Sequence, residues 1–181
     1  MSPFLTKIYY FKSFIQFKSR GKNIMFSRRG KFVRPREISF GNNIFINSSF
    51  HISARNLSLG SNIMIGPGLV IECDNHEYHQ VGQTMFETRN IRKIGNIIIE
   101  DDVWIGANVV ILPNVLIGEG CIIGAGSIIS KSLPPYSICV GNPCKPIKCR
   151  FNAVNLAKHL SLVKSSKKVD EIIENFRTYK L

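Results

Sequence analysis

Isoleucine recurs every six residues in the second half of this chain, at Ile99, Ile105, Ile111, Ile117, Ile123 and Ile129. Each is followed four positions later by a small or apolar residue, namely Val103, Val109, Val115, Cys121, Ser127 and Leu133. A period of six does not fit an α-helix, because the apolar face of a helix repeats every three to four residues. It is a multiple of the two-residue period of a strand, so all six isoleucines can point to one side. The pattern therefore predicts a parallel β-helix, in which short strands stack coil upon coil.

The same period governs the first half of the chain, with one irregularity. An extra residue separates two groups of three, Phe40, Ile46 and Ile52 and then Leu59, Ile65 and Ile71. Asparagine and glycine cluster between these positions, and both residues tolerate the positive φ that sharp corners require. We therefore expect coils with Asn- and Gly-rich corners from about residue 33.

The repeat stops over residues 72–96, where neither a strand period nor a helix period is present. The interval from Ile71 to Ile99 is not a multiple of six. A long insertion without its own periodicity in a compact repeat array is usually functional or disordered. Because the coils resume afterwards, residues 72–96 are predicted to form a loop extruded from the wall of the solenoid.

Both ends of the chain have helical patterns. Ser2 and Pro3 are typical of a helix start, and apolar residues at helical spacing predict a short amphipathic helix over about residues 3–18. Residues 153–176 also follow a helical pattern, with a polar break at Ser165-Ser166, and can cap the open end of the solenoid. The predicted fold is all-β, a left-handed parallel β-helix with short N-terminal and C-terminal helical segments. Its parts are a basic helical arm (1–32), the β-helix (33–150) and a helical tail (151–181).

Charge is distributed unevenly along the chain. Residues 1–36 hold ten of the 24 Lys and Arg residues and no Asp or Glu, within a net charge of +12. Such an arm favours anionic partners, although a merely solvated basic face has the same composition. The aromatic residues and lysines of residues 3–18 also suit peripheral contact with a membrane. The five cysteines include no C-x-x-C pair, and together with the lack of a signal peptide or membrane span they favour the cytoplasm.

Residues 97–148 closely resemble the hexapeptide-repeat acyltransferases. The motifs that carry the resemblance are VWIG (103–106), ILPNV (111–115), IGAGS (123–127), KSLPP (131–135) and GNPCKPI (141–147). They are most similar to those of galactoside, maltose and virginiamycin O-acetyltransferases and of polysaccharide O-acetyltransferases. The resemblance implies a left-handed β-helix, assembly as a homotrimer, and acetyl-CoA bound as acetyl donor between adjacent subunits. It implies no resident metal.

Acetyl transfer to a hydroxyl needs a base, and histidine suits that role near neutral pH. His76 lies in the 72–96 insertion and matches the place of the family's catalytic histidine, while His79 is the alternative base. Asn75 and His79 are also candidates to contact the acceptor. The carboxylate that orients the base is left open among Glu72, Asp74 and Glu77.

The resemblance also assigns the donor site. It implies that the backbone at Ala107 and Ala125 lines the pantetheine arm, with Ser130 nearby and Trp104 beside the thioester. The nucleotide phosphates would meet three lysines, Lys131, Lys145 and Lys148. The family often has arginine where Lys145 and Lys148 stand, and lysine lacks the bidentate fork of arginine.

The expected function is O-acetylation of a saccharide in the biosynthesis of a surface polysaccharide, with an anionic or lipid-linked saccharide as the candidate acceptor. An N-acetyltransferase acting on an amino-sugar nucleotide is the main alternative. A zinc hydratase like the γ-class carbonic anhydrases is remote, because the regular coils offer no further histidine ligands beside His76 and His79. A nucleic-acid-binding module is also disfavoured, because no nucleic-acid motif accompanies the charge.

Overall fold

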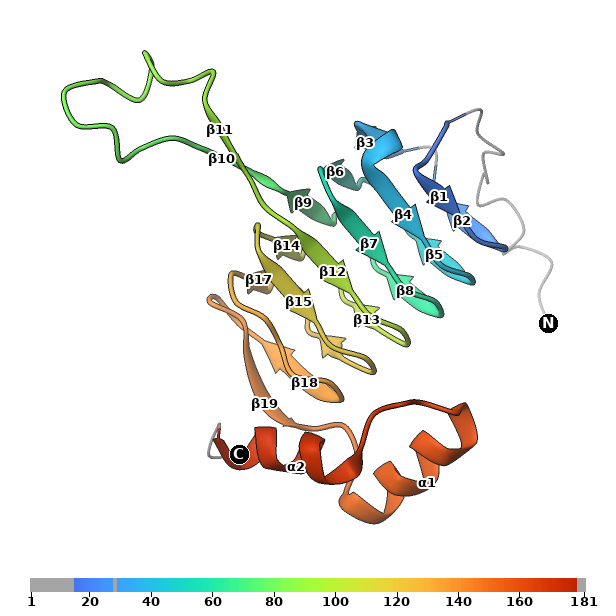
Figure 1. The fold of residues 1–181 in the computed structure, drawn as a ribbon. Helices are drawn as coiled ribbons and strands as arrows, with labels where there is room; N and C mark the ends of the chain where they lie inside the picture. Colours follow the sequence, from blue (N-terminus) through green and yellow to red (C-terminus); the bar gives the residue numbers. More distant parts are fainter. Residues whose placement is uncertain (1–14, 28, 179–181) are drawn as a thin grey trace.

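The described part of the chain is a solenoid of short parallel strands with a projecting hairpin and two terminal helices (Figure 1). A computed structural model describes residues 15–27 and 29–178. Each of the first five coils contributes one strand to each of three sheets, consistent with the predicted left-handed β-helix. No helix in the described residues is long and apolar enough to cross a membrane.

The three sheets are named here in the order in which each coil visits them. The first sheet contains β1 (Ser19–Arg20), β4 (Ile38–Phe40), β7 (Leu57–Leu59), β12 (Ile97–Ile99) and β15 (Val115–Ile117). The second sheet contains β2 (Ile24–Phe26), β5 (Ile44–Ile46), β8 (Ile63–Ile65), β13 (Trp104–Ile105), β16 (Ile122–Ile123), β18 (Ser137–Val140) and β19 (Lys145–Cys149). The third sheet contains β3 (Lys31–Val33), β6 (His51–Ser53), β9 (Val70–Glu72), β14 (Val110–Ile111) and β17 (Ile128–Ile129).

The interior of the solenoid is the hydrophobic core, and the isoleucine repeat fills it. All six isoleucines of the repeat are at most 1% exposed, and the residues four positions later are buried as well. They stack in register, since Ile99 pairs with Leu59 on one side and with Ile117 on the other. The predicted inward-facing positions are therefore confirmed.

The corners use the residues that the sequence predicted. Asn23, Asn43 and Asn62 occupy equivalent positions between the first and second sheets, and their φ angles are 58°, 57° and 61°. Their side chains form a ladder, in which Asn23 Nδ2 donates to Asn43 Oδ1 at 3.1 Å and Asn43 Nδ2 donates to Asn62 Oδ1 at 2.9 Å. Asparagine thus satisfies both the backbone conformation and the hydrogen bonding of this corner.

The solenoid begins nearer the N-terminus than the predicted boundary at residue 33. Strands β1, β2 and β3 lie before or at that boundary and pair with β4, β5 and β6. Most of the helix predicted over residues 3–18 lies outside the described residues. Its last part is not helical, because Ile15 to Lys18 have no regular secondary structure and Lys18 N donates to Ile38 O at 2.9 Å.

An aromatic cluster covers the N-terminal end of the core. Phe17 meets Phe40 edge-on with ring centroids 4.9 Å apart, and it meets Phe32 at 5.2 Å. Phe26 and Phe32 meet in the same way at 5.1 Å. These perpendicular contacts suit the positive edge and negative face of the rings, so the first coil closes the core with aromatic side chains.

Two helices cover the other end, as the sequence predicted. The helices α1 (Ala153–Val163) and α2 (Val169–Thr178) are separated at Lys164, which has a positive φ of 57°. They form a second small core with Tyr136, whose hydroxyl donates to Glu119 Oε1 at 2.6 Å. The helices therefore close the C-terminal end of the solenoid (Figure 1).

Two adjacent isoleucines of β12, Ile98 and Ile99, test which side chains of this strand point into the core and which point outward. Ile99→Ala is expected to lower the free energy of unfolding by about 2–5 kcal/mol, because it removes buried methylenes and leaves a cavity. Ile98→Ala should cost clearly less, since Ile98 is 42% exposed whereas Ile99 is 1% exposed. Urea unfolding followed by circular dichroism measures both, and equal losses would contradict the assignment.

Candidate functional site

The predicted loop is an antiparallel hairpin that leaves the solenoid at the corner between the third and first sheets (Figure 1). Its strands are β10 (Asp74–His76) and β11 (Arg92–Ile94), with His76 directly opposite Arg92. At the root, Gly95 N donates to Cys73 O at 2.8 Å. The insertion therefore leaves and re-enters the stack at one point, and its stem is ordered by strand pairing.

Asp74 anchors this root to the two preceding coils. Its side chain is only 5% exposed, and its Oδ2 lies 3.3 Å from Arg55 Nε and 3.7 Å from Arg34 Nη1. Arg34 and Arg55 occupy the same corner in the first and second coils. A carboxylate buried between two guanidinium groups fixes the start of β10, two residues before His76.

His76 is exposed on the hairpin stem and contacts the opposite strand. Arg92 Nη1 lies 3.5 Å from His76 Nε2. A guanidinium group only donates hydrogen bonds, so Nε2 is the accepting nitrogen in this contact. The hairpin therefore presents His76 together with a cation beside its Nε2.

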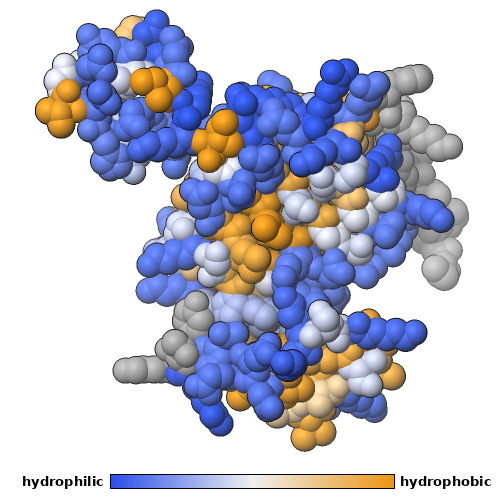
Figure 2. Space-filling model, in the orientation of Figure 1, coloured by the Kyte–Doolittle hydropathy of each residue, from blue (hydrophilic) through white to orange (hydrophobic). Residues whose placement is uncertain are grey.

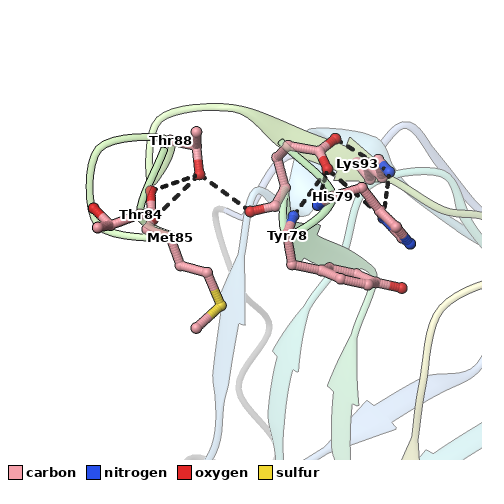
Figure 3. A network of polar contacts seen from close by, with 7 residues as sticks. Tyr78, His79, Thr84, Met85, Thr88 and Lys93 are labelled. Atoms are coloured by element: carbon pink, nitrogen blue, oxygen red, sulfur yellow. Dashed lines mark hydrogen bonds and ion pairs between the residues drawn. The ribbon is translucent and has the colours of Figure 1, made fainter. Parts of the chain in front are cut away.

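His79 lies in a different network, just beyond the stem (Figure 3). Its Nδ1 is 3.7 Å from Glu77 Oε1 and 3.5 Å from Lys93 Nζ, and its ring stacks on Tyr78 with centroids 4.1 Å apart. Lys93 Nζ also forms an ion pair with Glu77 Oε2 at 3.1 Å. His79 is thus held by neighbours within the hairpin.

Glu77 organises that network. Its Oε1 accepts hydrogen bonds from His79 N at 2.7 Å and Tyr78 N at 2.9 Å. These backbone donors, His79 N above all, and the nearby Lys93 ammonium hold the pKa of the Glu77 carboxyl below its ordinary value. The carboxylate therefore keeps its hydrogen bonds throughout the neutral range.

The outer part of the hairpin turns around a buried threonine. Thr88 is 3% exposed, and its hydroxyl lies 3.2 Å from Glu77 O and 3.4 Å from the carbonyl oxygens of Thr84 and Met85 (Figure 3). Around this point the tip exposes large apolar side chains, including Val81, Met85 and Phe86. An ordered loop with an apolar surface is typical of a segment that packs against another molecule.

None of the three candidate carboxylates lies within 4.0 Å of His76 in the described residues. Glu72 faces His51, with 3.7 Å between Oε1 and Nε2, while Asp74 and Glu77 have the partners described above. The neighbour of His76 is instead Arg92, which the sequence analysis did not single out. Only the antiparallel pairing of the two stem strands brings it there, and residues 72–96 show no period that indicates such pairing.

The residues assigned to the pantetheine arm form one column. Ala107 and Ala125 lie in successive turns at the corner between the second and third sheets, where Gly126 N donates to Ala107 O at 2.8 Å. A Cβ added at Gly106 would lie 2.7 Å from Ala125 N, so only glycine allows this close stacking. Trp104, on β13 beside this corner, is 51% exposed. The column offers a flat backbone surface flanked by an indole.

The three lysines predicted to bind the phosphates lie elsewhere, and so does Ser130, which was predicted near the pantetheine arm. Ser130 and Lys131 follow β17 at the same corner as the hairpin, two coils further along the solenoid. Lys145 and Lys148 lie on β19, at the C-terminal edge of the second sheet. All four residues are exposed.

Within one protomer these groups do not converge. The third sheet runs between the corner of Ala107 and Ala125 and the corner that carries the hairpin. The structure thus brings His76, His79 and Asn75 together on the hairpin, and Trp104, Ala107 and Ala125 together at the column. It does not bring the hairpin to its own column.

Other chemistry near the hairpin is limited. Cys73 precedes Asp74, but burial raises the pKa of its thiol to about 11, so it is protonated at neutral pH. In residues 15–27 and 29–178, no group of three His, Cys, Asp or Glu side chains is arranged to hold a metal ion. A polar cavity of about 360 Å³ beneath α1 includes Asp102, Glu119 and His159 but none of the predicted site residues.

Residues 96–131 match the sequence family described as bacterial transferase hexapeptide (six repeats). A probable macrolide acetyltransferase of Lysinibacillus sphaericus is 47% identical over 81 residues, which are 45% of this chain and 45% of that protein. The chain spans less than half the length of the curated relatives it matches.

Solved structures cover more of the chain. A maltose O-acetyltransferase from Clostridium difficile 630 is 33% identical with a TM-score of 0.67, over 74% of this chain and 70% of that one. A variant of AntD, an N-acyltransferase from Bacillus cereus in complex with dTDP-4-amino-4,6-dideoxyglucose and coenzyme A, is 26% identical with a TM-score of 0.56. That match covers 82% of this chain and 92% of the other.

The Glu77 network can be tested by amide exchange. Glu77→Gln should lower the protection factors of the Tyr78 and His79 amides several-fold at neutral pH, because a neutral amide oxygen is a weaker acceptor than the carboxylate that accepts from both. Since the folded pKa of Glu77 is lowered, this protection should persist above the ordinary glutamate range and disappear as the pH falls through the lowered value. Hydrogen exchange read by NMR measures both effects.

Glu87→Gln is the matched control. Glu87 Oε2 accepts from Thr84 N at 2.7 Å in the same hairpin, so its loss should affect the Thr84 amide and leave Tyr78 and His79 unchanged. Equal protection of Tyr78 and His79 in Glu77→Gln and the unaltered chain would show that the network does not order this segment.

Proposed function

Because the chain belongs to the hexapeptide-repeat acyltransferase family, we propose that it transfers an acetyl group from acetyl-CoA to a hydroxyl of a saccharide, with His76 as general base. The observation that carries this proposal is the hairpin, which interrupts an otherwise regular solenoid and holds His76 Nε2 as a hydrogen-bond acceptor. The similarity to a maltose O-acetyltransferase supports the hydroxyl as the acceptor group.

The reaction is a direct transfer. His76 Nε2 takes the hydroxyl proton as the oxygen attacks the thioester carbonyl, and the bond from carbon to sulfur then breaks. The proton held on His76 passes to the departing sulfur, so the products are the O-acetyl ester and CoA thiol. The acceptor hydroxyl must replace Arg92 at Nε2, because both compete for the same lone pair.

Acetyl-CoA is proposed to lie along the column of Ala107 and Ala125. Its pantetheine amides need backbone partners rather than charges, and the glycine stacking keeps this corner free of side chains. Trp104 would pack beside the thioester, with Ser130 nearby. Lys131, Lys145 and Lys148 would meet the phosphates as single positive charges rather than as bidentate forks.

We further propose a homotrimer with active sites between subunits. The hairpin and the column occupy different corners of one protomer, so a neighbouring copy must supply one of the two. Exposed apolar residues at the hairpin tip, together with Leu116 on the first sheet, provide surfaces for such packing (Figure 2).

Asn75 and His79 are proposed to contact the acceptor, since they lie on the hairpin beside His76. The acceptor class fits the biosynthesis of a surface polysaccharide. All five cysteines are free thiols, which is consistent with action in the reducing cytoplasm.

An N-acyltransferase is the second candidate. It is favoured by the similarity to AntD, which was solved with an amino-sugar nucleotide and matches 82% of this chain. A panel of hydroxyl sugars and amino sugars, assayed by release of CoA thiol, separates the two candidates. Turnover with amino sugars alone would replace O-acetylation by N-acetylation.

His76→Ala should reduce kcat for acetyl transfer by about 10²–10⁴-fold, because a general base contributes about this factor. Binding of CoA, measured by calorimetry, should be nearly unchanged, since the proposed contacts of CoA are made by the column and the three lysines and not by His76. His79→Ala is the comparison: it should raise KM for the acceptor and leave kcat largely intact, because His79 is proposed to bind the acceptor and not to take its proton. A reversed order of the two variants would move the base to His79.

Mixing two inactive variants tests the shared site. Ala125→Tyr should block the column, while His76→Ala removes the base. Chains of both kinds unfolded and refolded together at equal amounts should recover about one quarter of the wild-type activity, since half the hairpins and half the columns are intact and pair at random. Activity no higher than that of the separate variants would place the whole site in one chain.

A further inference from the structure

We propose that the first coil of the solenoid is a docking surface for an anionic lipid bilayer. The surface, named here the basic coil, consists of five exposed cationic residues: Lys18, Arg20, Lys22, Arg29 and Lys31. The proposal stands on their charge, on their place at one end of the molecule and on the composition of the chain before them.

The charge of the protein is concentrated at this end. Ten of the 24 Lys and Arg residues precede Glu37, which is the first acidic residue, so residues 1–36 carry +10 of the net +12. In the described residues, no Asp or Glu oxygen lies within 4.0 Å of a charged nitrogen of the basic coil. Arg34 and Arg36, by contrast, are occupied by Asp74 and Gln16. The positive charges of the basic coil are therefore not neutralised by neighbouring carboxylates and can attract an external anion.

These charges sit on a rigid end of the solenoid rather than on a separate arm. Arg20 is in register with the buried Phe40, yet it is exposed because it lies in the first coil. The aromatic cluster of Phe17, Phe26 and Phe32 lies in the same coil, and the terminal helices cover the opposite end (Figure 1). Both ends of the chain are cationic, but residues 1–36 contain no Asp or Glu, whereas residues 145–181 combine nine Lys and Arg with three Asp and Glu.

The sequence before the basic coil favours a bilayer over a soluble polyanion. After Met1, residues 2–14 contain seven large apolar or aromatic residues, with only Lys7 and Lys12 as charges: Phe4, Leu5, Ile8, Tyr9, Tyr10, Phe11 and Phe14. Aromatic and apolar side chains gain from the interface between headgroups and acyl chains, and adjacent lysines gain from anionic headgroups. A nucleic acid or acidic polysaccharide in solution offers no such apolar region.

Docking by this end would define the acceptor class, and this step rests on the proposed function. The hairpin leaves the third coil, and two steps between parallel strands span about 10 Å. His76 would then stand close above the headgroups, where a saccharide linked to a lipid through phosphate lies. The acceptor is therefore inferred to be a lipid-linked saccharide.

Vesicle flotation of the full-length protein tests the docking surface. It should float with vesicles of phosphatidylcholine mixed with phosphatidylglycerol, and not with phosphatidylcholine alone, and added salt should reduce binding. Lys22→Glu with Lys31→Glu should weaken the partition coefficient more than about tenfold, since each basic residue contributes about fivefold. Lys158→Glu with Lys168→Glu changes the net charge equally at the helical end and should leave binding unchanged.

The possible outcomes distinguish a failure of the proposed docking surface from a failure of the proposed catalytic function. Equal losses in the two double variants would mean that net charge alone acts, and failure to float with anionic vesicles would overturn the proposal. Binding to polyuridylate that persists in the presence of excess anionic vesicles would replace the bilayer by a nucleic acid. His76→Ala should float like the wild type, so a failure of the proposed chemistry leaves this result intact. Both double variants should still acetylate a soluble sugar.

Discussion

Every coil of this protein must place its inward side chains on those of the coils beside it. The backbone hydrogen bonds between coils fix the spacing, and the stacking of like residues fixes the register. Ile97 therefore pairs with Leu57 of the preceding coil, on the far side of the insertion, as well as with Val115 of the following coil. An insertion in such a stack must leave and return at one point. The hairpin meets this requirement, with Cys73 and Gly95 hydrogen-bonded at its root.

The same stacking constraint determines where functional side chains can be placed. Inward positions of the coils are filled by apolar side chains, and the outward positions that alternate with them lie on the walls. A side chain that projects away from the wall therefore needs contacts of its own to fix its position. The hairpin obtains it from Asp74, which two guanidinium groups hold at the solenoid, and from Thr88, which lies buried under its tip. His76 lies between these two fixed points. Its position therefore depends on polar contacts rather than on the hydrophobic core.

The sequence predicted the parts of the structure that obey the repeat. The isoleucine period located the core of the coils from residue 97, and the Asn and Gly residues located the corners. It did not locate the first coil, where inward positions are aromatic and the step from Ile24 to Ile44 is longer than the regular step from Ile97 to Val115. The helix predicted over residues 3–18 included Phe17, although Phe17 packs on the end of the core. Arg92 was missed because its pairing with His76 depends on an antiparallel register that no periodicity in residues 72–96 records.

The separation of the hairpin from its own column gives the fold a functional consequence. A triangular solenoid presents three corners, and the column and the hairpin use two different ones, with the third sheet between them. In the proposed trimer, three such prisms packed around an axis would bring a corner of one copy against a wall of the next, so that the proposed base and the proposed donor site would meet between copies. Because the coils stack at a constant spacing, the position of the hairpin along the solenoid axis differs from that of the column by whole coil steps. Assembly and register would together decide whether His76 reaches the thioester.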